Sequence, residues 1–182
     1  MPKLVRKINK AKWLQIDIET SKDVSADAIT LCLKTNQNCL SVWRIETDRE
    51  LENAVLAIVS AQDRLEAIDI VVLDESALLK SRIEIDISPG LTPVSDLVNH
   101  HRDLKNLTLS KLKEISTLIV EYLLFDESRD RTKCPNSKVR ITKRQTLDII
   151  KNGIDKKLLK TGDLKESVKE EVFKIFPHLR VE

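Results

Sequence analysis

Five residues of the sequence have types and spacings that could hold a pair of divalent metal ions. Asp17 and Glu19 stand two positions apart, so on a strand both carboxylates would point to the same face of a sheet. Asp103 follows later in the chain, and Tyr122 and Asp126 stand four positions apart. Acids around two metal ions can activate a water molecule and stabilise the leaving oxygen of a phosphodiester. The chemistry open to these residues is therefore Mg²⁺- or Mn²⁺-dependent cleavage of nucleic acid.

The surroundings of these residues resemble, in order, the three motifs of the three-carboxylate-plus-one exonucleases. Residues 17–20, Asp-Ile-Glu-Thr, resemble the first motif. Residues 99–103 fit the Asn-x-x-x-Asp spacing of the second motif, and residues 122–126 fit the Tyr-x-x-x-Asp spacing of the third. The resemblance implies a metal-dependent nuclease that uses Asp17, Glu19, Asp103, Tyr122 and Asp126.

The context of the motifs favours a plainer interpretation. The family's first strand is followed by two further strands, whereas residues 24–33 have apolar side chains at helical spacing. Only 18 residues separate Asp103 from Tyr122, which is short for the helices that the family places there. We therefore expect Asp17 and Glu19 to lie on the solvated side of an ordinary strand. We expect no catalytic residue and no metal ligand, and the nuclease is the alternative.

Other catalytic and cofactor motifs are absent from the sequence. The three glycines are Gly90, Gly153 and Gly162, and none forms a phosphate-binding loop or a dinucleotide fingerprint. No serine or cysteine lies in a nucleophile motif. We expect no cofactor, apart from Mg²⁺ or Mn²⁺ in the nuclease alternative.

The distribution of charge is the strongest functional signal. The net charge of the chain is only +2, but residues 13–128 hold 11 bases against 21 acids, and residues 129–160 hold 11 bases against three acids. Lysine and arginine clustered in this way attract phosphates by counterion release, or dock on an acidic protein surface. The predicted binding residues are Arg140, Lys143, Arg144 and Lys151.

The composition predicts a soluble protein of the cytoplasm. Hydrophobic residues make up 41% of the 182 residues, which is enough for a packed core. The three cysteines form no Cys-x-x-Cys pair and are typical of free thiols in a reducing compartment. No apolar run reaches the length of a membrane span or of a signal peptide. We expect no contact with a membrane, and the oligomeric state stays open.

Periodicity along the chain predicts an α/β fold with a small, mainly parallel sheet and crossover helices. Strands are expected at 13–19, 39–46, 68–73 and 82–87, and helices at 24–33 and after the capping box at 47–50. Strands that alternate with helices imply right-handed crossovers between parallel strands.

Residues 88–93, Ser-Pro-Gly-Leu-Thr-Pro, interrupt the regular pattern. We expect an α/β sheet unit over 1–90 and a mainly helical, basic unit over 91–182. The two units are expected to pack together, and one domain is an alternative description of them. Helices are expected at 109–123, 143–159 and 163–176, with a short strand at 138–141. The predicted function is that of a non-enzymatic intracellular accessory or interaction subunit. It would engage a protein partner, and possibly nucleic acid, through the basic C-terminal surface.

Overall fold

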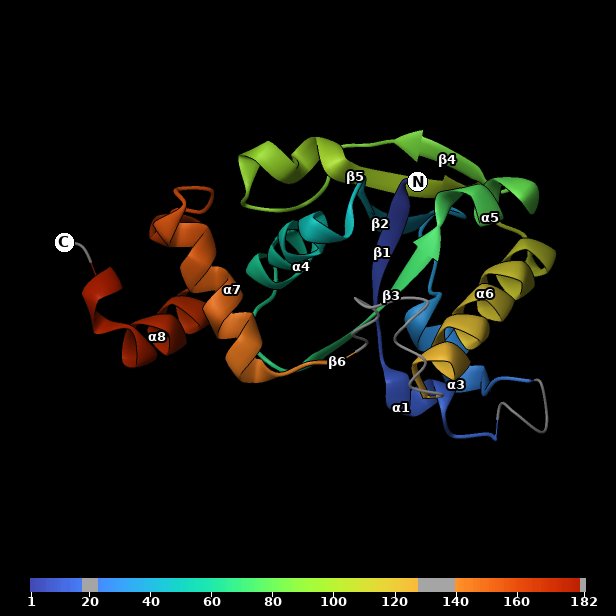
Figure 1. Ribbon diagram of the computed structural model, residues 1–182, viewed down its shortest axis with the longest axis horizontal. Helices are drawn as coiled ribbons and strands as arrows, with labels where there is room; N and C mark the ends of the chain where they lie inside the picture. The colour runs from blue at the N-terminus through green and yellow to red at the C-terminus, as the bar shows by residue number, and fades with distance from the viewer. Residues whose placement is uncertain (18–22, 128–139, 181–182) are drawn as a thin grey trace.

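Six strands form one sheet in which every neighbouring pair is antiparallel (Figure 1). The computed structural model describes residues 1–17, 23–127 and 140–180. The strands are β1 (Lys3–Ile8), β2 (Leu40–Ile45), β3 (Ile68–Asp74), β4 (Glu84–Ile87), β5 (His101–Lys105) and β6 (Arg140–Ile141). Their order across the sheet is β4-β5-β2-β1-β3-β6.

The predicted mainly parallel sheet is wrong, because a strand that the sequence did not reveal lies in its centre. β1 pairs antiparallel with β2 on one side and with β3 on the other. Two strands that are antiparallel to the same strand run parallel to each other. β2 and β3 therefore have the parallel orientation that was predicted for two strands joined by a helix. β1 separates the two parallel strands, and no parallel pair forms.

The strand expected at 13–19 is also wrong. Residues Lys10–Trp13 form a short helix, α1, and a turn follows it. Trp13 is fully buried and anchors the end of this helix, whereas Leu14 and Ile16 are exposed and form no buried face of a strand. Glu19 lies outside the described residues.

Helices cover both faces of the sheet (Figure 1). On one face lie α4 (Leu51–Ser60), α7 (Lys143–Asp155) and α8 (Glu166–Ile175), and on the other lie α3 (Ala26–Cys32), α5 (Glu75–Lys80) and α6 (Leu109–Glu127). Short 3₁₀ helices are η1 (Asp48–Glu50), η2 (Ser95–His100), η3 (Thr161–Asp163) and η4 (Pro177–Leu179). β5 and β6 come from the second half of the chain and join the same sheet as β1 to β4.

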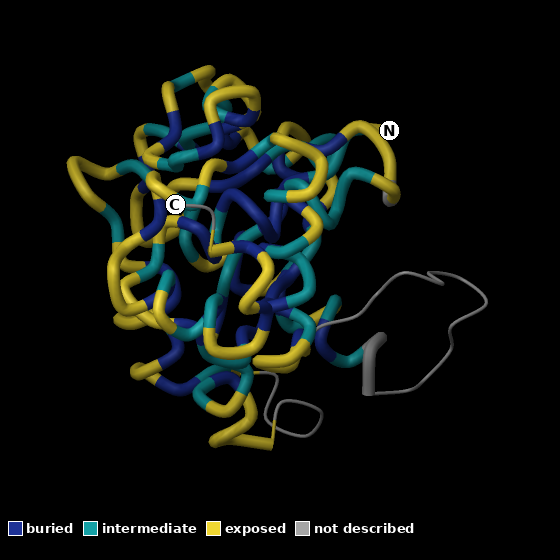
Figure 2. The backbone as a smooth tube through the Cα atoms, turned by 90° about the vertical axis from the view of Figure 1, so that its left-hand side faces the viewer, coloured by how far each residue is buried: buried dark blue, intermediate teal, exposed yellow. Residues whose placement is uncertain are grey.

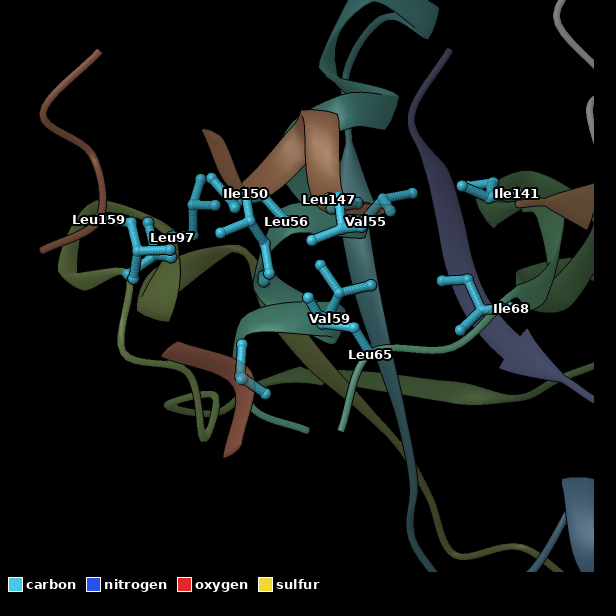
Figure 3. Close-up of a cluster of buried hydrophobic side chains, with 14 of the residues drawn as sticks. Val55, Leu56, Val59, Leu65, Ile68, Leu97, Ile141, Leu147, Ile150 and Leu159 are labelled. Carbon is cyan, nitrogen blue, oxygen red and sulfur yellow. The ribbon is translucent and has the colours of Figure 1, made fainter. Parts of the chain in front are cut away.

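The first face is held by α4, which packs between the sheet and α7 (Figure 3). Val55 and Leu56 of α4 are buried in a cluster with Leu147 and Ile150 of α7. Gly153 allows the close approach of the two helices, because a Cβ at this position would lie 2.8 Å from Leu56 Cδ2. α7 begins at a capping box in which Thr142 and Gln145 satisfy each other's backbone N–H groups.

The second face buries one stripe of α6 against the sheet. Ile115, Ile119 and Leu123 are fully buried in a cluster with Leu4 of β1 and Leu73 of β3. Figure 2 shows the buried backbone in the interior and the exposed turns around it. None of the described helices is long and apolar enough to cross a membrane.

Gly90 occupies a position where even one methyl group has no space. A Cβ there would lie 2.5 Å from Trp43 Cη2 and 2.8 Å from His101 Cβ. We expect Gly90→Ala to lower the free energy of unfolding by about 1–3 kcal/mol, because the Trp43 ring must move within a packed core. Urea unfolding measures the change.

Gly162→Ala is the matched control, since no atom of the described structure lies within 4 Å of a Cβ at Gly162. Equal unfolding midpoints for the two variants would contradict the close packing at Gly90.

Candidate functional site

The structure does not bring the predicted nuclease residues together within its described part. Asp103 lies on β5 opposite Ser41, next to the paired residues Trp43 and His101. Trp43 packs on the face of the sheet that α4 covers. Tyr122 lies on α6, which packs on the other face. Asp17 follows α1 and is exposed.

Asp126 lies in the last turn of α6, and its side chain is outside the described part of the chain. Among the described residues, no three His, Cys, Asp or Glu side chains are grouped as metal ligands.

Asp103 and its neighbours on β5 have structural contacts. Ser41 Oγ donates a hydrogen bond to Asp103 Oδ1 at 3.3 Å. The His101 ring is buried, its Nδ1 lies 2.9 Å from Ser88 Oγ, and its edge meets the Trp43 ring at a centroid distance of 5.2 Å. These contacts link β5 to β2 and to the segment that precedes η2.

Each of the four basic residues predicted to bind a partner has a carboxylate neighbour in the same chain. The pairs are Arg140 with Asp69 at 3.1 Å, Lys143 with Glu171 at 2.6 Å, Arg144 with Asp148 at 3.3 Å, and Lys151 with Asp155. Arg144 and Lys151 also lie over the Phe176 ring, at 5.4 and 5.9 Å from its centroid. The four charges therefore stabilise contacts of β6, α7 and α8, and nucleic-acid binding by this block stays a prediction.

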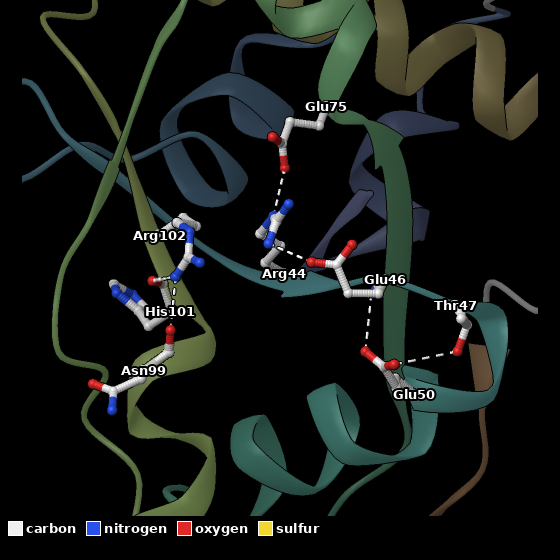
Figure 4. Close-up of polar contacts among 8 residues, drawn as sticks. All are labelled: Arg44, Glu46, Thr47, Glu50, Glu75, Asn99, His101 and Arg102. Carbon is white, nitrogen blue, oxygen red and sulfur yellow. Dashed lines mark hydrogen bonds and ion pairs between the residues drawn. The ribbon is translucent and has the colours of Figure 1, made fainter. Parts of the chain in front are cut away.

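A polar network at one end of the sheet joins β2 to the start of α5 (Figure 4). Arg44 Nε donates to Glu75 Oε2 at 2.8 Å, and Arg44 also pairs with Glu46. The bond to Glu75 raises the pKa of Arg44 above its ordinary value. β1 lies between β2 and β3 in the sheet, and Glu75 directly follows β3 in the chain. The bond between Arg44 and Glu75 therefore connects β2 to the end of β3 across β1.

Arg102 completes the network from β5. Its Nη1 donates to the carbonyls of Asn99 and His101, both at 2.7 Å, and burial, followed by the charge of Arg44, lowers its pKa. A hollow of about 190 Å³ lies among Arg44, Glu46, His100 and Arg102. Arg44, one of its two arginines, is already bonded to the carboxylates of Glu46 and Glu75.

The best candidate for a binding site is a groove between α3 and α6. It has a volume of about 570 Å³, and its walls are mostly apolar. One wall is a continuous stripe of α6, and the other comes from the start of α3 and the residues before it. The lining residues are Asp23, Val24, Ile29, Leu109, Leu112, Lys113, Ser116, Thr117, Val120, Glu121 and Leu124.

The polar side chains inside the groove leave it apolar in character. Ser116 Oγ donates to the Leu112 carbonyl at 2.7 Å, and Thr117 Oγ1 donates to the Lys113 carbonyl at 3.1 Å. Because both hydroxyl protons are used within α6, neither needs a partner from a ligand. Leu109, at the start of the stripe, is 86% exposed.

The sequence shows the apolar side chains of α6 that line this groove, but it does not show which of them are buried by the sheet and which are not. Leu109 and Leu112 lie in the helix predicted at 109–123 and share the helical spacing of its buried residues Ile115 and Ile119. The sheet buries only the part of the stripe around Ile115 and Ile119. Leu109, Leu112, Val120 and Leu124 line the groove instead, and sequence periodicity alone does not distinguish such side chains from core.

Comparison of the chain with protein-family models, with curated proteins and with solved structures finds no match.

The pair between Arg140 and Asp69 makes a testable structural contribution. Asp69 is buried and also accepts a hydrogen bond from the Lys10 backbone N–H at 3.1 Å. Arg140→Ala leaves this carboxylate without its charged partner, which destabilises the fold. The Arg140 side chain is 63% exposed, so solvent screening limits the expected loss of unfolding free energy to about 1 kcal/mol.

Chemical unfolding of Arg140→Ala measures this loss, with Lys156→Ala as the control for removing an exposed basic side chain from the same region. If both variants have the stability of the wild type, Arg140 is not an anchor of β6.

Proposed function

We propose that the chain is a non-enzymatic interaction protein that binds a helix of a partner protein in the groove between α3 and α6. The observation that supports this proposal is the apolar stripe of α6 from Leu109 to Leu124 that lines the groove, because its side chains are exposed or only partly buried against the core. At a rise of about 1.5 Å per residue the stripe is about 22 Å long, which matches about four turns of a bound helix.

The walls of the groove indicate the chemistry of the partner. Leu112, Val120 and Leu124 offer apolar contact at helical spacing, so the partner helix is expected to present apolar residues at i, i+4 and i+7. Two of the three charged lining residues are acids, Asp23 and Glu121, against one base, Lys113. Basic residues beside the partner's apolar stripe complement this charge. We further propose that the complex forms in the cytoplasm, as the composition predicts.

Val120→Glu tests the groove directly. A carboxylate in the middle of the apolar wall must lose water when a helix covers it, so binding of the partner helix is expected to weaken by about tenfold or more. Leu79→Glu is the matched control, because Leu79 is an exposed leucine on α5 outside the groove. Circular dichroism checks that both variants fold.

The partner segment can be found by placing a photo-reactive phenylalanine analogue at position 117 and cross-linking in the cells that produce the protein. Mass spectrometry then identifies the segment, and a synthetic peptide of it is titrated against the wild type and both variants. The proposal predicts a helical, apolar segment that binds the wild type and Leu79→Glu equally and Val120→Glu weakly. Equal binding to all three proteins would refute it.

A further inference from the structure

The sheet is open between β1 and β2 over half of their length. β1 pairs with β3 at all six residues from Lys3 to Ile8, but with β2 only at Lys3, Leu4 and Val5. The facing residues of β2, from Leu40 to Val42, pair with β5 on their other side. The opening therefore lies inside the sheet and not at its edge, at the place where the next pair of the ladder would form.

Arg6 reaches into this opening. Its Nη1 donates to the Ser41 carbonyl at 2.5 Å, and its Nε and Nη2 donate to the Cys32 carbonyl at 2.9 and 2.6 Å. The guanidinium thus replaces backbone pairing between the strands and connects β1 to β2 and to the end of α3. A guanidinium carries five N–H donors, so two remain after these three bonds.

The charge of Arg6 has no carboxylate partner among the described residues. Burial lowers its pKa to about 10, so the side chain remains a cation at neutral pH. The two carbonyls supply partial negative charge only. A partly buried cation without a full counter-charge favours the entry of an anion.

A cavity of about 430 Å³ adjoins the guanidinium. Its walls combine the polar groups of Arg6 and Ser41 with apolar side chains, among them Trp43 and Ile58. Leu31 and Leu91 also line it and are 60% and 92% exposed, so apolar residues continue from the wall to solvent. Apolar walls around a few convergent donors are typical of sites for small organic ligands.

We propose that this cavity binds a small carboxylic acid, with the carboxylate on Arg6 and an apolar chain or ring against Ile58, Leu31 and Leu91. Arginine binds a carboxylate by charge-assisted N–H···O bonds, which are stronger than bonds between neutral groups. The apolar body gains by leaving water. The site is separate from the groove between α3 and α6 and does not depend on the proposed function.

The test is a titration of the ¹⁵N-labelled protein with octanoate and with benzoate, up to about 10 mM, followed by NMR. Octan-1-ol is the matched probe that keeps the chain and lacks the carboxylate. We expect saturable shifts of the amides of Leu31, Ile58 and Leu91 with at least one of the two acids, and affinity about tenfold weaker for the alcohol than for octanoate if octanoate binds.

Two variants locate the carboxylate. Leu91→Asp places a negative charge at an exposed position of the cavity mouth, where it repels the acid without disturbing the core, and it should weaken binding about fivefold or more. Arg6→Met removes the charge and keeps an apolar side chain, whereas Arg49→Met removes an exposed arginine elsewhere and should bind as the wild type does. If Arg6→Met does not fold, Leu91→Asp and octan-1-ol decide the question.

Failure of both acids to saturate would overturn the proposal. Equal affinity for octanoate and octan-1-ol, or unchanged binding of the acid by Leu91→Asp, would do so as well.

Discussion

The pairing of β1 with β3 is the interaction on which the rest of the structure depends. Among the described strands, β1 alone joins the β4-β5-β2 part of the sheet to the β3-β6 part. Its six residues pair fully with β3, and its contact with β2 is shared between a short ladder and the side chain of Arg6. Arg44 and Glu75 reinforce the junction from the other end of the strand. The chain has few glycines, and a third of its residues are charged. Two arginines, Arg6 and Arg44, thus connect the central strands at the boundary between β1 and β2.

The two proposed binding sites follow from how incompletely this frame is covered. The sheet fully buries one stripe of α6 and leaves a neighbouring stripe only partly buried beside α3, so an apolar groove remains that a helix could fill. The seam between β1 and β2 leaves a cavity beside the partly buried guanidinium of Arg6. In contrast, the four binding residues predicted in the basic segment 129–160 form ion pairs with acids of the same chain.

Sequence patterns predicted the elements whose side chains have one clear environment. The strands expected at 39–46 and 68–73 and the helices expected at 24–33 and 109–123 are confirmed as β2, β3, α3 and α6, and α3 begins at Ser25, whose Oγ accepts the Ala28 N–H. β1 was missed because its residues Lys-Leu-Val-Arg-Lys-Ile do not alternate between apolar and polar, and half of them are charged. Once β1 was missed, an antiparallel sheet could not be deduced. The groove and the cavity depend on which residues of different elements meet, which no local period encodes.

Amide hydrogen exchange of β1 tests the central role of this strand most directly. A strand paired on both sides in the middle of the sheet exchanges its amides only when the whole fold opens. The amides of Lys3 to Ile8 that bond to β3 are therefore expected to exchange as slowly as those of β3 itself. Exchange of residues 3–8 at the rate of an unstructured tail, with β3 still protected, would contradict the central position of β1 and with it the seam that Arg6 closes.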